Sequence, residues 1–431
     1  MIWSRYNEFV QGPDKVHALF NCRTRMWITL VPELYIFLKE RINNLCEVES
    51  QHPTLYETLV NNKFIVPSFE SEISECIEEC ESKLSSSKVL KLTVNPTLDC
   101  NLRCWYCYEQ HLHGSCMTPT IIEAIYKYID KSLLNGKYEK LQLAFFGGEP
   151  LMKFDKVVNP MLIQVKKICE KHNVDFAVSF TTNGVFLTKR VRTAIKDITS
   201  NVAVQIPFDG DANLHDCVKK FPNGKGSYQL VKNNARDAAI EGFRVTVRCN
   251  ATKSNIRSFQ NVVKDFEDLL SLPNLRFSFH KVWQEADDDE FKSGIVDLKS
   301  GVSHQSFTSN IHSYFGDSVN PCYGDYANNY VFNYNGDVFK CTARDFNTQN
   351  RIGYLNDSGD IEFNNSALIR TKKSLTSECP TCRRLPFCPI CSQSRAESKD
   401  GKCPAHITSE EIILNINQFY LDLSNQNQPA V

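Results

Sequence analysis

Short apolar runs alternate with helical patterns from residue 89 to residue 280. The runs are rich in β-branched and aromatic residues, as strands are, and cover residues 89–94, 141–146, 176–181, 202–208, 243–250 and 275–280. Between them, apolar residues recur at helical spacing, as after the helix-start pair Thr118-Pro119. Strands that alternate with helices form parallel sheets, whose sites lie at the carboxyl ends of the strands. The pattern predicts an α/β domain of six parallel strands over residues 89–285.

The flanking segments follow other patterns. Residues 1–88 predict a strand pair near 15–20 and 26–30, helices near 32–42 and 53–61, and a short strand at 64–67. Residues 70–87 are acidic and then serine-rich, and we interpret them as a helical linker at the end of this segment. Residues 286–320 are predicted as a bridge. Residues 321–431 are predicted to form a cysteine-rich domain that ends in a helix.

Composition narrows the class of protein. The 431 residues carry a net charge of −1, so no global charge favours nucleic acid or an anionic membrane. No segment has 18 consecutive apolar residues and the first residues lack a secretory pattern, so we expect a cytoplasmic protein without a membrane span. Eighteen cysteines are many for such a chain. Because disulfide frameworks belong to small secreted domains, the cysteines indicate metal.

Three of these cysteines, Cys100, Cys104 and Cys107, share one loop directly after the first predicted strand. Thiolates bind iron, zinc and Cu(I), and three from one loop can hold three corners of a cluster. A fourth local ligand is missing, since Cys116 is nine residues further on. An iron without a protein ligand can bind a substrate or a cofactor. Half of a zinc site is the alternative interpretation.

The spacing Cys-x3-Cys-x2-Cys, with Tyr106 before the last cysteine, resembles the signature of radical S-adenosylmethionine (SAM) enzymes. In that family SAM chelates the open iron of a 4Fe–4S cluster. The reduced cluster then cleaves SAM to methionine and a 5′-deoxyadenosyl radical. The resemblance implies a partial (β/α)6 TIM-like radical SAM barrel, and an external one-electron reductant of the flavodoxin or ferredoxin type.

The ends of the later strands carry further motifs of this family. Gly147-Gly148-Glu149-Pro150 resembles the motif that holds the SAM amino group, in which glycines allow close approach to a ligand. Two departures stand beside Asp209: Pro207 replaces a usual serine, and Lys219 replaces an arginine and so loses the bidentate fork. The resemblance implies a cofactor-binding set of Tyr106, Gly147, Gly148, Glu149, Thr182, Asn183, Asp209, Lys219 and Arg248.

Seven cysteines follow near the C-terminus. Two Cys-x2-Cys pairs alone would fit a zinc ribbon, but the full array resembles the SPASM domain, which holds two auxiliary 4Fe–4S clusters. The resemblance assigns Cys379, Cys382, Cys388 and Cys403 to the outer cluster, and Cys322, Cys341 and Cys391 to the inner one. Gly316 stands where some relatives have an eighth cysteine. We therefore predict an inner cluster with an open iron or a non-cysteine ligand, with Cys217 and Cys249 as outside candidates.

The function expected from this family is maturation of a ribosomally made precursor peptide. Residues 1–88 resemble the winged-helix-like module that binds leader peptides. Sulfatase-maturing relatives carry an aspartate base after the cysteine of Gly-x4-Cys, but here Thr342 follows Cys341 and Asp345 is the nearest carboxylate. This difference favours installation of a thioether or carbon–carbon crosslink. The alternatives are a SPASM dehydrogenase or sulfatase-maturase-like oxidation, and, in another class, a zinc-stapled non-catalytic interaction protein. The sequence carries no signal for the peptide, the bond or the oligomeric state.

Overall fold

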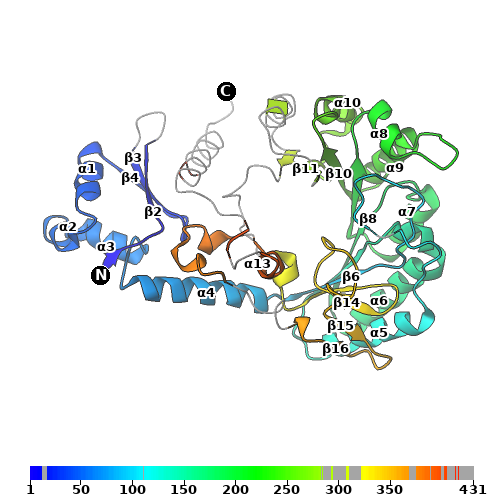
Figure 1. Ribbon diagram of the computed structural model, residues 1–431, viewed down its shortest axis with the longest axis horizontal. Coiled ribbons are helices and arrows are strands. Elements are labelled where there is room, and N and C mark those ends of the chain that lie inside the picture. The colour runs from blue at the N-terminus through cyan, green and yellow to red at the C-terminus, as the bar shows by residue number, and fades with distance from the viewer. Residues whose placement is uncertain are drawn as a thin grey trace. The chain divides into compact units, whose positions relative to one another are not determined.

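The computed structural model describes residues 1–11, 17–109, 111–282, 284, 293–294, 307–309, 322–367, 375–388, 390–398, 402–404, 413 and 416. The chain divides into two compact units (Figure 1). One unit contains Met1–Ser86, Ser313–Ala327 and Leu368–Val431. The other, which we call the barrel unit, contains Ser87–His312 and Asn328–Ala367.

The barrel unit is organised around a sheet that has eleven strands among the described residues. Seven of them run parallel in sequence order: β6 (Val89–Val94), β7 (Lys140–Phe145), β8 (Asp175–Thr181), β9 (Val202–Phe208), β10 (Arg244–Ala251), β11 (Leu275–Lys281) and β12 (Phe307–Ser309). The first six are the predicted strands, each placed within one residue of its expected start and end. The α/β fold with a parallel sheet is therefore confirmed.

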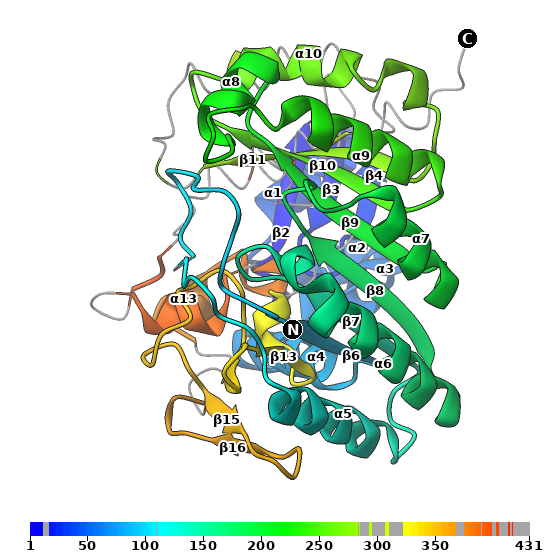
Figure 2. The same cartoon turned by 90° about the vertical axis from the view of Figure 1, so that its right-hand side faces the viewer.

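Helices cover one face of this sheet (Figure 2). They are α5 (Pro119–Leu133), α6 (Asn159–Lys171), α7 (Lys189–Ile198), α8 (Ala212–Val218), α9 (Tyr228–Ile240) and α10 (Phe259–Lys264), with shorter turns η1 (Pro150–Lys153), η2 (Phe154–Val158), η3 (Ile256–Ser258) and η4 (Glu267–Leu269). Side-chain caps start several of them; Thr118, for example, accepts a hydrogen bond from the Ile121 amide ahead of α5. The strands pack on the helices with alternate residues: Leu90, Leu92 and Val94 of β6 are buried, while the residues between them are partly exposed.

The sheet extends further than the alternating pattern predicts. β13 (Asn329–Phe332) pairs in parallel with β6, and β14 (Asp337–Phe339), β15 (Gly353–Leu355) and β16 (Ile361–Phe363) continue the sheet as antiparallel strands. Residues 328–367, which we assigned to the cysteine-rich C-terminal domain, thus complete the edge of the barrel sheet. β12 falls within the predicted bridge, most of which lies outside the described residues. The four linear domains themselves stay a prediction.

The other unit begins with a small α/β segment. β2 (Asn7–Gln11), β3 (His17–Asn21) and β4 (Trp27–Leu30) form an antiparallel sheet, and β1 (Ile2–Trp3) pairs with β5 (Ile65–Val66). The helices are α1 (Pro32–Glu40), α2 (Leu45–Gln51), α3 (Pro53–Asn61) and α4 (Phe69–Ser85), and α4 begins with a capping box of Ser68 and Ser71. The expected strand pair is present, and the helices expected near 32–42 and 53–61 are α1 and α3. The prediction missed α2 between them, because its seven residues are too few to show helical periodicity.

The cysteine-rich segment packs in this same unit. It forms η6 (Tyr323–Asp325), η7 (Cys379–Thr381), η8 (Leu385–Phe387) and α13 (Ser392–Ala396). Cys379 and Leu385 share a hydrophobic cluster with Cys76 of α4, and Arg383 pairs with the Glu8 carboxylate of β2. Among the described residues, no helix is both long and apolar enough to cross a bilayer.

Candidate functional site

The loop that carries Cys100, Cys104 and Cys107 connects β6 to α5 and is anchored at its base. Asp99, 4% exposed, accepts hydrogen bonds from the amides of Cys100 (2.9 Å) and Gly114 (3.0 Å). Thr97 donates to the Ser115 carbonyl at 2.6 Å. Although burial raises it, the pKa of Asp99 is held below its ordinary value, because these amides and nearby cations favour the carboxylate. The loop therefore leaves and rejoins the barrel at a fixed point.

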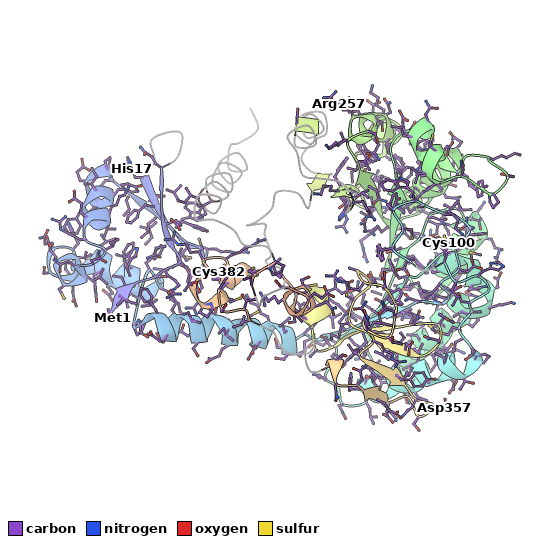
Figure 3. All side chains as sticks on the ribbon, viewed as in Figure 1. Met1, His17, Cys100, Arg257, Asp357 and Cys382 are labelled. Atoms are coloured by element: carbon purple, nitrogen blue, oxygen red, sulfur yellow. The ribbon has the colours of Figure 1, made fainter. Side chains whose placement is uncertain are left out.

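The three thiols of this loop lie close enough to influence one another. Burial raises the pKa of Cys100 to about 12 and that of Cys107 to about 11, with contributions from neighbouring cysteines. Burial also raises the pKa of Cys104, against the nearby Lys219. Such thiols ionise only when a cation compensates the charge, as a metal centre does. The donor set thus fits an iron–sulfur cluster. Figure 3 marks Cys100 in the barrel unit.

Among the described residues, no three His, Cys, Asp or Glu side chains converge tightly enough to hold a single metal ion. A 4Fe–4S cluster does not need such convergence, since its thiolates bind at separate corners of a larger group. A zinc site requires four donors around one ion.

Gly147 and Gly148 follow β7 and lie against the backbone of the cysteine loop. A Cβ atom on Gly148 would lie 2.2 Å from the Asp99 carbonyl oxygen, and one on Gly147 would lie 2.4 Å from that of Thr97. Gly147 also has a φ of +103°, which favours glycine. We expected these glycines to bring the backbone close to a ligand. In the structure, the close approach that they permit is to the loop carrying the cysteines.

Glu149 is fully buried and organises the end of β8. Its carboxylate accepts hydrogen bonds from the Thr182 hydroxyl (2.8 Å) and from the amides of Asn183 (2.7 Å) and Leu151 (3.0 Å). Burial raises the pKa of Glu149 to about 7, against these three donors. The Asn183 side chain in turn donates to Asn101 at 2.8 Å and lies 3.8 Å from the Cys100 sulfur. Glu149, Thr182 and Asn183 thus form one hydrogen-bonded group beside the cysteine loop.

A second polar group connects Tyr106 to the ends of β9 and β10. The Tyr106 hydroxyl donates to Asp209 at 2.6 Å and accepts from Lys219 at 2.5 Å and from the Asn250 amide at 2.9 Å. Lys219 also donates to the Asp209 carboxylate. Burial alone would lower the pKa of Lys219, but Asp209 and Tyr106 raise it well above the usual value. Lys219 is therefore a buried cation held within this group.

His215 and Asp216 follow β9, and His215 contacts this group through Asp209. The Nδ1 atom of His215 accepts from the Asp209 amide at 3.4 Å, and Asp216 accepts from the Tyr228 amide at 2.8 Å. Arg248 donates from Nε to Asn250 at 3.0 Å, and burial lowers the pKa of its guanidinium. The nine predicted cofactor residues therefore fall into two groups. Gly147, Gly148, Glu149, Thr182 and Asn183 follow β7 and β8 beside the cysteine loop. Tyr106, Asp209 and Lys219 form the second group, which Arg248 joins through Asn250.

The four cysteines predicted for an outer cluster lie together in the other unit. Burial raises the pKa of Cys382, and the neighbouring Cys388, Cys379 and Cys403 raise it further. Arg395 donates to the Cys388 sulfur at 3.2 Å, and the Thr376 amide donates to the Cys379 sulfur at 3.3 Å. Four thiols in reach of one another fit a cluster with complete cysteine ligation. Figure 3 labels Cys382 in this group.

The predicted inner set is divided between the units. A hydrogen bond joins Cys322 to Cys391 and raises the pKa of Cys322. Cys341 belongs to the barrel unit, and Gly316 lies outside the described residues. The two outside candidates differ: Cys249 is buried in the barrel core, whereas Cys217 is exposed. The ligands of an inner cluster therefore stay a prediction.

Sequence reasoning missed Glu109, two residues after Cys107. Both of its carboxylate oxygens are buried without a hydrogen-bond partner among the described residues. Burial raises the pKa of Glu109 to about 8, and the Asp345 carboxylate adds to the effect. A carboxylate that directly follows a metal-binding motif was a signal for this residue in the sequence. The nearness of Glu109 to Asp345 depends on the fold and was not predictable from the sequence.

Comparison with known proteins identifies the barrel. The model of the radical SAM superfamily matches residues 94–266. A cysteine-type anaerobic sulfatase-maturating enzyme of Clostridium novyi (strain NT) is 24% identical over 349 residues, which cover 74% of this chain and 90% of that enzyme. The radical SAM cyclopropyl synthase TigE of Paramaledivibacter caminithermalis is 24% identical over 235 residues, 49% of this chain and 46% of that protein.

Solved structures agree on the fold. The structure of native anSMEcpe with bound AdoMet is similar with a TM-score of 0.56 at 18% identity, covering 79% of this chain and 100% of that one. Streptococcus suis SuiB is similar with a TM-score of 0.50 at 16% identity, covering 90% and 95%. The family match contains the three-cysteine loop and the carboxyl ends of β7 to β10. On these grounds residues 94–266 of this chain form a radical SAM domain.

Proposed function

We propose that this protein reductively cleaves SAM and uses the radical to oxidise a residue of a peptide substrate. The observation that carries the proposal is the loop with Cys100, Cys104 and Cys107, which falls within the radical SAM match. When bound, a 4Fe–4S cluster and SAM supply the electron transfer and the hydrogen-abstracting radical. The protein's own residues hold the loop, compensate its charge and exclude water.

The two polar groups at the strand ends would perform these tasks. Asn183, held by Glu149, fixes Asn101 and contacts the Cys100 sulfur. Tyr106 fixes the loop to β9, and the buried Lys219 places a positive charge near Cys104. A preorganised cation stabilises negative charge on thiolates without reorganisation when the redox state changes. Tyr106, Asp209 and Lys219 therefore act as positioning residues, with Thr182 and Arg248 as further cofactor contacts.

A peptide is the proposed substrate, and a crosslink within it is the proposed product. A solved relative, anSMEcpe, contains both AdoMet and a Cp18Cys peptide. The antiparallel sheet β2–β3–β4 offers a way to bind a leader segment, because an extended peptide can add to a sheet edge. Leader binding predicts slower amide hydrogen exchange in β4 when precursor peptide is added. Slowing confined to the barrel unit would contradict it.

Sulfatase-maturase-like oxidation is a second candidate, favoured by the similarity to the Clostridium novyi enzyme over 90% of its length. Thr342 after Cys341 argues against it, whereas Asp345, close to Glu109, offers a carboxylate nearby. Mass spectrometry of the product peptide distinguishes the two candidates. A crosslink removes two hydrogens and keeps the cysteine sulfur, whereas formylglycine formation removes the sulfur.

The test of the chemistry is 5′-deoxyadenosine formation from SAM by anaerobically reconstituted protein with dithionite. Cys100→Ala should abolish it, because the cluster loses a ligand. Cys169→Ala is a matched control, since Cys169 is a buried cysteine of the barrel core outside every predicted ligand set. Full activity in Cys100→Ala would refute the proposal. Stoichiometric zinc without sulfide would support the non-catalytic, zinc-stapled alternative.

Three 4Fe–4S clusters and an external one-electron reductant belong to the same proposal. The four neighbouring cysteines around Cys382 support a second cluster. The contact between Cys322 and Cys391 supports a third, with an open iron or a non-cysteine ligand. Auxiliary clusters would accept the electron that the substrate radical returns when the new bond forms.

A further inference from the structure

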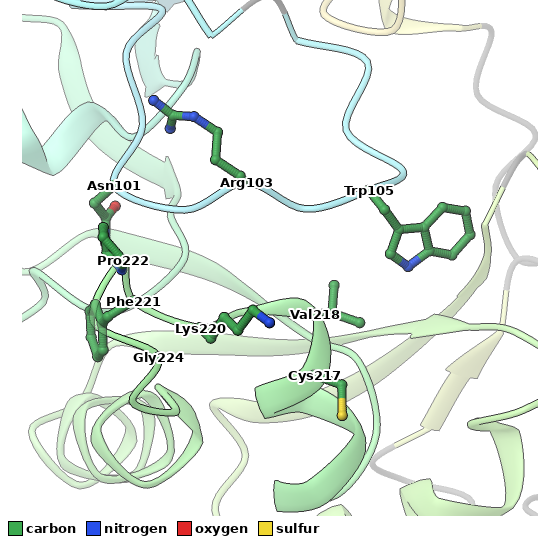
Figure 4. A pocket seen from close by; sticks show the side chains of 9 residues that line it. All are labelled: Asn101, Arg103, Trp105, Cys217, Val218, Lys220, Phe221, Pro222 and Gly224. Carbon is green, nitrogen blue, oxygen red and sulfur yellow. The ribbon is translucent and has the colours of Figure 1, made fainter.

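A cavity of about 490 Å³ lies between the cysteine loop and the end of α8 with the turn that follows it (Figure 4). The loop supplies one wall, with Trp105 and Arg103, and the Arg103 guanidinium extends to the far side of the loop from Lys220. The opposite wall comes from the end of α8 and the turn after it, with Val218 and Lys220. None of the nine predicted cofactor residues lines this cavity. It is therefore a feature separate from the two polar groups that hold the loop.

The lining of the cavity is cationic. Among the described residues that line it, Arg103 and Lys220 are charged and none carries a carboxylate. Of the acids described nearby, Asp99 lies 3.8 Å from the Arg103 guanidinium and offsets part of its charge. Asp209 pairs with Lys219, Asp211 caps α8, and Asp216 accepts from the Tyr228 amide, so these acids leave Lys220 uncompensated. The Lys220 side chain is exposed, while the preceding Lys219 is buried. This surface therefore favours a negatively charged partner.

The cavity also has an apolar anchor beside the cysteines. Trp105 is 60% exposed, an unusual state for a large aromatic side chain, and it stands between Cys104 and Cys107 in the chain. Exposed aromatic residues with cations around them are typical of protein interfaces. A partner that covers Trp105 would approach the cysteine loop without entering the barrel.

We propose that this cavity and its rim, formed by Arg103, Trp105 and Lys220, are the docking surface of an acidic one-electron carrier protein. The inference rests on the proposed function, which requires an external electron. The carrier is oxidised by one electron, the protein's cluster is reduced by one electron, and no covalent bond forms or breaks. Complementary charge would speed the encounter and orient the carrier toward the loop.

The test measures carrier binding to the reconstituted holoenzyme by calorimetry, with a purified bacterial flavodoxin and a bacterial ferredoxin as probes. Lys220→Glu should weaken binding about fivefold at low salt, as expected for loss of one interfacial charge pair. Lys220→Gln should have a smaller effect, and Trp105→Ala should weaken binding at all salt concentrations. At about 0.5 M salt, wild type and Lys220→Glu should converge because the charges are screened.

Lys189→Glu is the matched control, since Lys189 is an exposed lysine of α7 that does not line the cavity. Equal weakening in Lys189→Glu, unchanged affinity in Lys220→Glu, or no binding of either probe to wild type would each overturn the proposal. Dithionite-driven 5′-deoxyadenosine formation should be the same in wild type and Lys220→Glu. If dithionite gives no product in wild type, the proposed function fails, while carrier binding still decides the docking surface. Weaker peptide binding in Lys220→Glu, with carrier binding intact, would assign the cavity to the substrate.

Discussion

Lys219 donates a hydrogen bond to the Asp209 carboxylate, and each of these side chains is only 2% exposed. Burying two charges is costly, and the pair is retained only where geometry and further hydrogen bonds compensate. Here Tyr106, which belongs to the cysteine loop, supplies those bonds to both partners. The ion pair therefore joins the loop to the end of β9.

The first prediction concerns this pair. Asp209→Asn leaves Lys219 buried without its counter-ion, and should lower the free energy of unfolding by about 3 kcal/mol. Urea denaturation of the anaerobic protein measures the change. Asp155→Asn is the control, because Asp155 pairs with Arg190 on the surface; it should give no measurable change. In a double-mutant cycle with Lys219→Met, the two effects should be far from additive. Additive losses would show that the pair does not act as a unit.

A second prediction follows from the close approach of Gly148 to Asp99. Gly148→Ala places a methyl group 2.2 Å from a carbonyl oxygen, so that the cysteine loop must shift. We expect a lower melting temperature and loss of the iron bound by this loop. Gly136→Ala tests the alternative that any glycine change destabilises the barrel, since Gly136 has a positive φ but no atom within 4 Å of its Cβ position. It should cost about 1 kcal/mol, with full iron content. Normal iron in Gly148→Ala would contradict the packing argument.

The parallel strands were predictable because their apolar runs depend on local sequence and burial. The edges of the sheet were not predictable. In the sequence β13 is a short run with polar residues on either side, and only the fold shows that it pairs with β6. The residues of the candidate site divide in the same way, into those that the sequence shows and those that only the fold brings together. The cysteine spacing was visible in the chain, but the contact between Lys219 and Tyr106 joins residues far apart in sequence. The role of Gly148 likewise depends on a backbone that only the fold brings near.

The third prediction is metal content. Replacement of Cys100, Cys104 and Cys107 by alanine should remove about four irons from a total of about twelve per chain, with matching loss of sulfide. Cys169→Ala should retain all of them, because Cys169 is a core residue of α6. Iron and sulfide analysis on anaerobically purified protein measures both. An unchanged iron count in the triple variant would place the clusters elsewhere.

The fourth prediction is a pH dependence of stability. Burial, together with the Lys219 ammonium, lowers the pKa of His215 to about 3, whereas an unfolded histidine titrates near about 6.5. Between these values the unfolded state binds more protons. The contribution of His215 to the free energy of unfolding is therefore fully present above about pH 6.5. It is lost as the pH falls, by at most about 1.4 kcal/mol per pH unit.

Urea denaturation at about pH 7.5 and about pH 5.5 checks this sign, with iron content confirmed at each pH. The stability difference between wild type and His215→Asn should shrink toward the lower pH. A difference that is constant with pH would mean that His215 does not titrate as the structure indicates.

The last prediction tests the cysteines around Cys382. Cys382→Ala should remove about four irons while leaving SAM cleavage with dithionite intact, because the radical SAM loop belongs to the barrel unit. Cys76→Ala is a demanding control: Cys76 is buried in the same hydrophobic cluster as Cys379 but is not a predicted ligand. It should keep its iron. If Cys76→Ala and Cys382→Ala lost iron equally, packing rather than ligation would explain the loss. If Cys382→Ala instead abolished peptide oxidation and retained SAM cleavage, the outer cluster would be the acceptor for the electron that the substrate returns.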